Sequence, residues 1–390
     1  MQCKRAWMVF GLVLGLAGCA TNRVASTPPA DIWQDQAFNY QSAFVTETRE
    51  SLFALDADIV QSLQADKGTG HSTKRRLDLL LARLYGPAGI RLAYSSGHTT
   101  AASQTWHDQR GDCLSLTILA YAATRVLGIN AHMQEVRVPF AVDRRDGVDF
   151  INGHVNVVVR DEAEAVIDGR PYMTGGLIID FEPQVGVGRT GTWLTEDAIL
   201  ARFFNNRATE YLVQQDDAKA YAYFRAAIEK APDYAPAYAN LAQLYVRQGI
   251  AGAAERLLRH AMALEGPSYA PLHAMQKLLV EQGRVAEARH YADVLAKRQE
   301  EDPYYWIGVG LAAMDEQRHG AAIAALERAA SHASGFNEIH YYLAVAYWRN
   351  GQRDAASRQL VALSSIDQHD PRVALLTRKL NPIAPPPVAY

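Results

Sequence analysis

An alanine recurs at intervals of 34 residues through the second half of this 390-residue chain. The five alanines are Ala220, Ala254, Ala288, Ala322 and Ala356. The fourth residue after each alanine keeps the same spacing and is in most cases large and apolar: Phe224, Leu258, Ala292, Leu326 and Leu360. A small residue allows paired helices to approach closely, and the larger one fills the space between successive pairs. The period therefore predicts an all-α solenoid of stacked helical pairs.

Two further positions follow the same period. One is the predicted turn between the two helices of each unit, occupied by Gln215, Gly249, Gly283, Gln317 and Gly351. The other is mostly aromatic: Tyr211, Tyr245, Leu279, Ala313 and Tyr347. The combined pattern is similar to that of the tetratricopeptide repeat (TPR). We expect five repeats over residues 201–381, including the capping helix "PRVALLTRKL", and a Pro-rich tail over 382–390. The resemblance implies a concave surface that binds a protein or peptide partner.

Residues 31–200 contain no such repeat and combine helical with strand-like patterns. "TKRRLDLLLARLYG" (73–86) predicts an amphipathic helix that ends at its glycine. Stretches rich in β-branched residues predict three strands: "INAHMQEVRVPFAV" (129–142), "HVNVVVRD" (154–161) and "GGLIIDFEP" (175–183). We interpret the charged stretch "VDRRDGVDF" (142–150) as a loop. Because 390 residues exceed the usual size of one domain, we expect a separate α+β domain here.

The first 18 residues predict an export signal. Lys4 and Arg5 precede the apolar run "AWMVFGLVLGLAG", which is too short to span a bilayer. The run leads into "LAGC", which resembles the lipobox of bacterial lipoproteins. The resemblance implies cleavage before Cys19, acylation of that cysteine, and a tether over residues 19–30. Because no Asp follows Cys19, it also implies a lipid-anchored protein of the Gram-negative outer membrane that faces the periplasm.

Only three cysteines are present, and Cys3 and Cys19 belong to the signal and its cleavage site. Cys113 is then the only cysteine left, so we expect no intrachain disulfide. A lone cysteine in an oxidising compartment is either buried and inert or retained for chemistry. The formal net charge of −3 does not suggest a nucleic-acid partner. The chain shows no metal-ligand spacing and no phosphate-binding motif, so we expect neither a metal nor another cofactor.

Cys113 lies at the start of "CLSLTILAYAATRVLG", which predicts a buried helix. The N–H groups and the positive dipole of a helix start favour a thiolate. A nucleophilic thiol also needs a base and a group that orients the base. His154, at the start of a predicted strand, is the candidate base, and Asp180, on the next strand, is the preferred partner because its flanks are apolar. Asp168, in "VIDGRPY", is the alternative acid because it lies closer to His154 in the sequence.

The order Cys, His, Asp on a helix and two strands resembles the transglutaminase-like superfamily of cysteine enzymes. The resemblance is carried by "TTAASQTWHDQRGDCLSLTILAYAATRVLGINAHMQEVRVP", then "NGHVNVVV" and "IIDFEP". Bacterial lipoproteins that join such a domain to TPR repeats are more similar still. The resemblance implies a papain-like α+β fold, in which Cys113 attacks an amide carbonyl, His154 transfers the proton and Asp180 orients the imidazole.

The acyl intermediate of such an enzyme also needs donors for its oxyanion. The N–H of Cys113 is the first candidate, and Gln104 and Gln109 are side-chain candidates. The chain departs from many relatives at Asp112, where they have Asn: its charge opposes thiolate formation if it points inward, but as a helix cap it points away.

We therefore expect an envelope lipoprotein that hydrolyses or transfers peptide or side-chain amides through a thioester. Its repeats would recruit a protein partner, and its lipid anchor would hold it to the membrane. The alternative is a non-catalytic adaptor that binds envelope proteins through the repeats.

Overall fold

The computed structural model describes most of the chain between residues 28 and 380. The described ranges are 28–67, 72–95, 97–136, 142–145, 148–151, 154–159, 165–167, 170–172, 177–181, 191–265, 269–333, 337–366 and 371–380. The predicted signal peptide, Cys19, residues 19–27 of the predicted tether, Asp168 and the Pro-rich tail lie outside them. Within these ranges, no helix is long and apolar enough to cross a membrane.

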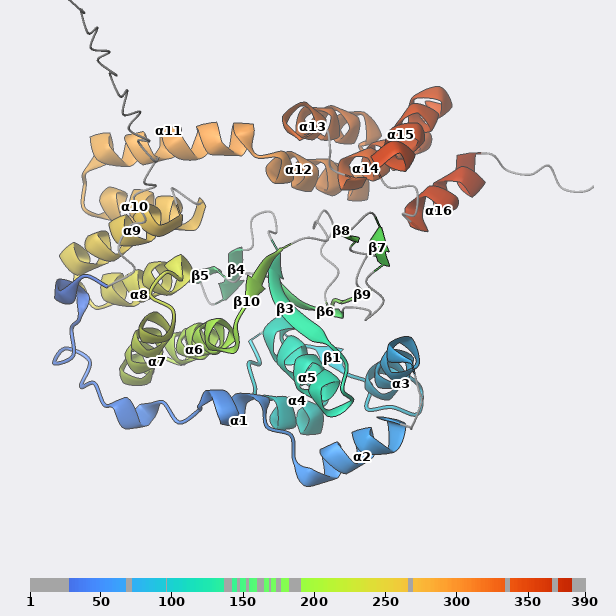
Figure 1. The fold of residues 1–390 in the computed structure, drawn as a ribbon. Coiled ribbons are helices and arrows are strands. Elements are labelled where there is room, and N and C mark those ends of the chain that lie inside the picture. Colours follow the sequence, from blue (N-terminus) through green and yellow to red (C-terminus); the bar gives the residue numbers. More distant parts are fainter. Residues whose placement is uncertain are drawn as a thin grey trace, which may run out of the picture.

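Residues 28–126 form short helices that lead into one buried helix, α5 (Figure 1). The elements are η1 (Ala30–Ile32), η2 (Ser42–Phe44), α1 (Arg49–Phe53), α2 (Ala57–Lys67), α3 (Thr73–Tyr85), α4 (Ala102–Asp108) and α5 (Cys113–Val126). The helix expected over residues 73–86 is present as α3, which begins after the cap Ser72 and buries three leucines. Helix α5 is buried over most of its length, as its apolar sequence indicates.

A four-stranded antiparallel sheet covers α5. Its strand order is β10–β3–β6–β9, formed by Thr192–Leu194, Ala131–Val136, His154–Val159 and Leu177–Ile179. Val155, Val157 and Val159 of β6 belong to the core that contains α5, and successive side chains of a strand point to opposite faces. His154 and Asn156 therefore project from the other face of the sheet.

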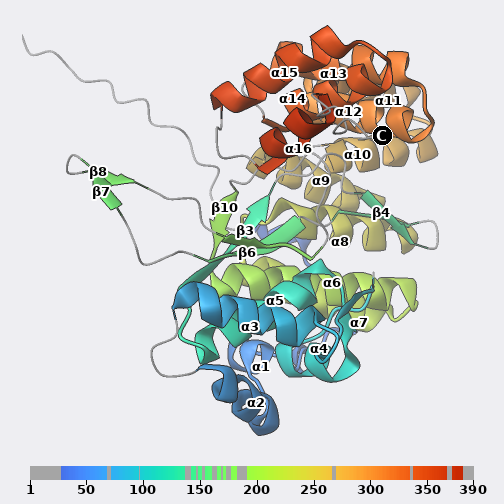
Figure 2. The same ribbon diagram turned by 90° about the vertical axis from the view of Figure 1, so that its right-hand side faces the viewer.

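Two hairpins lie outside this sheet. β4 (Val142–Arg145) pairs with β5 (Val148–Ile151), so the prediction of a charged loop over 142–150 is wrong. The missed signal is the Asp-Gly dipeptide at 146–147, which is favoured between two hairpin strands. β7 (Ala165–Ile167) pairs with β8 (Arg170–Tyr172), and Figure 2 shows this hairpin well away from the sheet. A short parallel pair, β1 (Ala93–Tyr94) and β2 (Arg110–Gly111), precedes α5.

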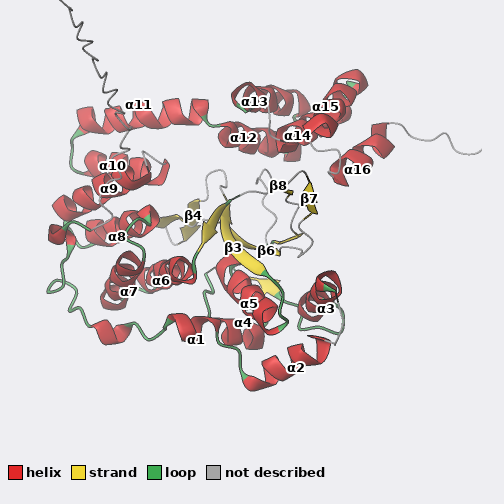
Figure 3. Cartoon of the chain, viewed as in Figure 1, coloured by secondary structure: helices red, strands yellow, loops and turns green. Residues whose placement is uncertain are grey.

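Helices α6 to α16 form an all-α solenoid (Figure 3). They are α6 (Glu196–Val213), α7 (Asp217–Lys230), α8 (Ala235–Arg247), α9 (Ala251–Glu265), α10 (Tyr269–Glu281), α11 (Val285–Glu301), α12 (Pro303–Asp315), α13 (His319–His332), α14 (Asn337–Arg349), α15 (Arg353–Ile366) and α16 (Pro371–Leu380). Helix α6 packs on α7, and α8–α9, α10–α11, α12–α13 and α14–α15 pair in the same way. The five alanines of the 34-residue series are each at most 3% exposed, which allows this close packing.

The turns of the solenoid adopt one backbone conformation. All five turn residues named by the period have positive φ, from 60° at Gln317 to 80° at Gly351. Glycine adopts this left-handed conformation without steric cost. Gln215 and Gln317 adopt it too, although a β-carbon disfavours it. The period therefore located each turn even where the residue type did not indicate it.

The solenoid curves round the sheet. In Figures 1 and 3, α6, α12 and α14 lie on the inner side of the curve and α7, α13 and α15 on the outer side. Helix α5 covers one face of the sheet, and Figures 1 and 2 show the later repeat helices on the opposite side. Helix α8 also contacts β5. The sheet face that carries His154 is thus turned toward the inner side of the solenoid.

One hydrophobic core extends through both predicted regions of the chain. Helix α6 begins after the cap Thr195, so the predicted boundary at residue 200 lies within this helix. The core residues run from Ile32 to Ala288, across that boundary. The two regions are therefore packed together rather than joined by a linker.

The N-terminal segment packs on the first two helical pairs. The Phe38 ring stacks on that of Tyr221, with 4.7 Å between their centroids. The Tyr245 hydroxyl donates to the carbonyl of Ile32 at 2.6 Å. These contacts fix the path of the chain just after the predicted tether.

Candidate functional site

Cys113 is the first residue of α5, and Asp112 caps that helix. One Asp112 oxygen accepts the N–H of Ser115 at 2.8 Å and its hydroxyl at 2.6 Å. The other oxygen accepts the hydroxyl of Thr99 at 2.5 Å and the amide of Asn206 at 3.2 Å. Asp112 is only 5% exposed, so these donors replace water around its charge. The carboxylate is thus engaged in capping α5.

Helix α6 of the solenoid supports the start of α5. Asn206 donates to Asp112, and Glu210 accepts the backbone N–H of Thr99 at 2.8 Å. Glu210 is 8% exposed and pairs with Arg207 at 2.5 Å. Burial raises the pKa of the Glu210 carboxyl, while the Arg207 charge acts in the opposite direction. The helix start that carries the candidate nucleophile is therefore held partly by the first repeat.

His154 and Asp180 are in direct contact. The imidazole Nε2 lies 2.9 Å from each carboxylate oxygen of Asp180. The two side chains are 3% and 19% exposed, so water competes little for the hydrogen bond between them. Because Nε2 faces Asp180, Nδ1 is the ring nitrogen that remains for another partner.

Asn156 is a third polar residue at this point of the sheet. Val157 pairs with Ile179, and one step along the two strands brings Asn156 beside Asp180. The Asn156 amide donates to Oδ2 of Asp180 at 3.1 Å. The sequence reasoning missed this residue, because nothing in a single polar position of an apolar strand indicates its cross-strand neighbour.

The start of α5 lies against the start of β6. Thr117 follows Cys113 by about one helical turn. Its hydroxyl donates at 3.1 Å to the carbonyl of Val155, the residue after His154. The chain returns from α5 through β3, whose last residue, Val136, pairs with His154. Both observations place Cys113 and His154 at the same end of the unit that α5 forms with the sheet. The structure thus places the starts of α5 and β6 at the same end of this unit and joins His154 directly to Asp180.

The predicted oxyanion donors Gln104 and Gln109 lie just before α5. Gln104 is exposed on α4 and donates its amide to Asp108 at 2.5 Å. Gln109 ends α4 with a φ of 54° and is also exposed. Their role stays a prediction, as do the catalytic roles of Cys113, His154 and Asp180.

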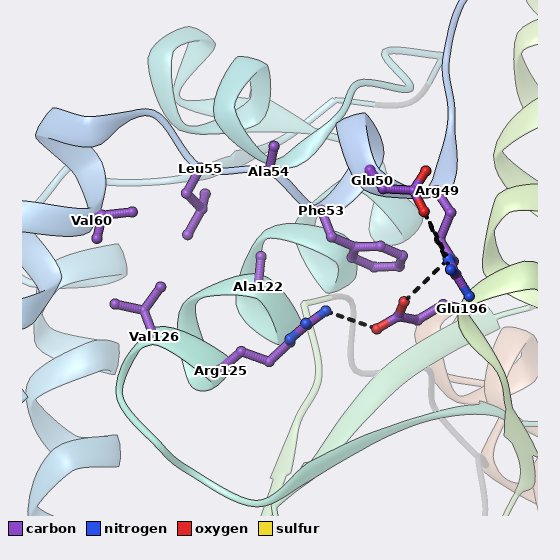
Figure 4. A pocket seen from close by; sticks show the side chains of 10 residues that line it. All are labelled: Arg49, Glu50, Phe53, Ala54, Leu55, Val60, Ala122, Arg125, Val126 and Glu196. Carbon is purple, nitrogen blue, oxygen red and sulfur yellow. Dashed lines mark hydrogen bonds and ion pairs between the residues drawn. The ribbon is translucent and has the colours of Figure 1, made fainter.

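A cavity of about 650 Å³ lies near the other end of α5 (Figure 4). Its apolar lining comes from Phe53, Ala54, Leu55, Val60, Ala122 and Val126. Arg125 and Arg49 flank it and both pair with Glu196, at 2.8 and 3.9 Å (Figure 4). Arg125 follows Cys113 by 12 residues, which is about 18 Å along a helix, so the cavity is separate from the candidate site.

Three exposed side chains have a composition suited to a metal ion. The ligand atoms of Asp56, Asp58 and His107 lie within 4.8 Å of one another. Carboxylates and imidazole are common ligands of divalent metals. The direct ion pair of His107 with Asp56, at 2.9 Å, is sufficient to bring these groups together. The sequence did not indicate this set, because the two paired residues are 51 positions apart.

Comparison with protein-family models matches residues 313–380 to the tetratricopeptide repeat family. The TPR prediction is thereby confirmed for the C-terminal region. No curated protein is similar to the chain.

Several solved structures are similar to part of the chain. The crystal structure of YrrB, a TPR protein with an unusual peptide-binding site, is 20% identical; the match covers 46% of this chain and 92% of YrrB, with a TM-score of 0.24. The Pseudomonas aeruginosa pilF structure is 18% identical over 48% of this chain and 85% of its own, with a TM-score of 0.26. MamA from Desulfovibrio magneticus RS-1 is 12% identical over 44% of this chain and 97% of its own, with a TM-score of 0.24. At these identities and TM-scores, the likenesses carry no argument about function.

Proposed function

We propose that this chain is an envelope lipoprotein with a transglutaminase-like, papain-like cysteine site that acts on peptide or side-chain amides. The observation that carries the proposal is the shielded His154–Asp180 pair, at the start of a strand that lies against the first turn of α5. A base that is oriented by a carboxylate and lies near a thiol at a helix start is an arrangement that activates cysteine. Cys113 occupies that helix start.

The proposed reaction proceeds through a thioester. The Cys113 thiolate attacks the amide carbonyl, the C–N bond breaks, and the protonated imidazole of His154 gives its proton to the leaving amine. Water or a lysine amine then attacks the thioester, His154 takes the proton of the attacking group, and the thiolate leaves. In both steps Asp180 accepts a hydrogen bond from the Nε2–H group, keeps its own charge and stabilises the imidazolium. The N–H groups at the start of α5 are the proposed oxyanion donors, with Gln104 and Gln109 as side-chain candidates.

The repeats are proposed to recruit the protein that carries the amide. Solenoids of this kind bind partners along their concave surface. The His154 face of the sheet is turned toward the inner side of the solenoid, so a segment bound there lies on the same side of the sheet as the His154–Asp180 pair (Figures 1 and 2).

Acylated Cys19 is proposed to hold the protein at the periplasmic face of the outer membrane. We expect cells grown with an alkyne-labelled fatty acid to label the chain and not the Cys19→Ala variant. Equal labelling of both would refute the anchor without bearing on the cysteine site.

The pH dependence of Cys113 alkylation tests the cysteine site, in a soluble form that starts at residue 20 and retains this cysteine alone. The alkylation rate of an ordinary thiol has its midpoint near about pH 8.5. We expect a midpoint well below this value, and a return toward it in His154→Ala and Asp180→Asn. His340→Ala is the matched control, because His340 of α14 contacts Gln359 of α15 at 2.7 Å, within the repeats and outside the proposed site. A wild-type midpoint near 8.5 that His154→Ala does not change would refute an activated thiol.

The second candidate function is a non-catalytic adaptor. It is favoured by the match of residues 313–380 to the TPR family, since such repeats fit protein-binding roles. The Cys113→Ser variant separates the two functions in a strain that lacks the protein. Full complementation by this variant supports the adaptor. Failure to complement, with folding and export intact, supports the enzyme.

A further inference from the structure

Asn156 is a buried polar residue to which the proposed reaction assigns no role. It is 2% exposed and lies two residues after His154, on the same face of β6. Its amide nitrogen donates to Oδ2 of Asp180 at 3.1 Å. Its own carbonyl oxygen, Oδ1, is also buried, and none of the described residues donates a hydrogen bond to it. A buried acceptor that receives no hydrogen bond destabilises the folded state, so the presence of asparagine at this position calls for an explanation.

Asp180 sets the orientation of this amide. Rotation by half a turn would bring Oδ1 against the carboxylate, where two acceptors repel each other. The nitrogen must therefore face Asp180, and Oδ1 must face away from it. Valine, which occupies the neighbouring positions 155 and 157, would carry no unpartnered group here. The unpartnered carbonyl is thus the consequence of supplying a donor to Asp180.

We propose that Asn156 is a positioning residue for the His154–Asp180 pair, an inference that rests on the proposed cysteine site. His154 Nε2 is equidistant, at 2.9 Å, from the two oxygens of Asp180, so the histidine alone does not select one of them. Asn156 binds Oδ2 and thereby leaves Oδ1 to accept the hydrogen bond of the Nε2–H group. Asn156 therefore keeps Asp180 oriented toward His154.

Two substitutions separate the donor of Asn156 from its unpartnered acceptor. Leucine is similar in size and lacks both groups, whereas threonine suits a strand and keeps a hydroxyl donor without the carbonyl. We expect Asn156→Leu to raise the midpoint of Cys113 alkylation by about one pH unit, which is about tenfold slower alkylation below the midpoint. We expect Asn156→Thr to stay close to the wild type. An unchanged or lowered midpoint in Asn156→Leu would overturn the inference.

Asn240 of α8 provides a matched control, because it is also a fully buried asparagine. Its amide donates to Asn205 at 2.9 Å and its carbonyl accepts from Gln243 at 3.4 Å, so both of its ends have partners. We expect Asn240→Leu to lower the urea midpoint of unfolding and to leave alkylation unchanged. We expect Asn156→Leu to leave the urea midpoint unchanged or to raise it. A fall as large as that of Asn240→Leu would give Asn156 a purely structural role.

A second readout distinguishes failure of this inference from failure of the proposed function. The Nε2 proton of His154 is followed by NMR with ¹⁵N-labelled histidine and assigned by its loss in His154→Ala. We expect its signal to shift and its solvent exchange to accelerate in Asn156→Leu. If His154→Ala moves the alkylation midpoint and Asn156→Leu does not, positioning is refuted and the cysteine site stands. If neither moves it, the cysteine site is refuted, and an unchanged Nε2 signal in Asn156→Leu then refutes positioning as well.

Discussion

Gly308 and Gly310 of α12 provide a matched test of how closely the two helices of a repeat approach. A β-carbon on Gly310 would lie 2.7 Å from Cγ and 3.0 Å from Cδ2 of Leu326 on α13, and 3.3 Å from the carbonyl oxygen of Ala322. Carbon atoms in ordinary contact are about 3.5–4.0 Å apart, and Leu326 is fully buried, so its side chain or its helix would have to move. A β-carbon on Gly308 would meet nothing within 4 Å beyond its own helix.

The magnitude follows from two terms. Replacing glycine by alanine within a helix stabilises the folded state by about 0.5–1 kcal/mol, because alanine loses less backbone freedom on folding. This term is common to both variants and cancels in their difference. Overpacking costs about 1–3 kcal/mol. We therefore expect Gly308→Ala to stabilise the α12–α13 pair and Gly310→Ala to destabilise it, with a difference of about 1–3 kcal/mol.

Hydrogen exchange of the amides in residues 303–333, followed by mass spectrometry, measures this difference locally. Since 1.4 kcal/mol is a factor of ten, exchange should be about 5 to 150 times faster in Gly310→Ala than in Gly308→Ala. Peptides from α5 provide an internal reference, because α5 does not belong to this repeat. Equal protection in the two variants would refute the reasoning, because it would show that the helices separate at no cost.

Three further perturbations test other parts of the structure. Asp112→Ala removes the cap of α5 and leaves buried donors without an acceptor, so we expect a loss of about 2–3 kcal/mol in urea unfolding; a loss below about 0.5 kcal/mol would contradict the capping role. Hydrogen bonds from Arg284 and, to a smaller extent, Arg259 lower the pKa of Glu255 below its usual 4.5. The ionised Glu255 carboxylate therefore stabilises the folded state above pH 4.5, and this stabilisation is lost as the pH falls through the lowered pKa. Glu255→Gln should therefore cost about 1 kcal/mol at pH 7 and nothing once the carboxyl is protonated; a loss that persists in acid would exclude this ion pair as its cause. Phe38 is 3% exposed, so Phe38→Ala leaves a cavity; we expect the free energy of unfolding to fall by about 3 kcal/mol and the N-terminal segment to be proteolysed faster. Unchanged proteolysis would show that other contacts hold this segment.

The repeats could be predicted from the sequence because their signal is local and recurs. The period identified Gln215 and Gln317 as turn residues, although neither is glycine, and both have positive φ. The same local reasoning predicted α5, whose apolar run follows the cap Asp112. It failed for the β4–β5 hairpin, because the charged residues of that stretch obscured the Asp-Gly turn signal. Local patterns therefore predicted elements well wherever composition and periodicity agreed.

The contacts of the candidate site are not local, so they depend on strand register and helix packing that the sequence does not display. His154 and Asp180 are 26 positions apart, and Asp168 remained an alternative as long as the register of β6 and β9 was unknown. Asn156 could be connected with Asp180 only through that register. Asn206 belongs to a repeat helix, and its bond to a residue 94 positions away has no counterpart in the repeat pattern.

Helix α6 makes the first repeat and the α5–sheet unit a single structural unit. Arg202, which is 8% exposed, binds Glu135 of β3 through two hydrogen bonds of 3.0 and 2.6 Å, and Asn206 binds the cap Asp112. Removing α6 would take from Glu135 both hydrogen bonds of Arg202 and from Asp112 the amide donor of Asn206, at a cost in stability. A partner protein that binds the inner side of the first repeat would contact the same helix that holds the start of α5. Any effect of partner binding on Cys113 therefore has a direct route through α6 and requires no movement of the later repeats.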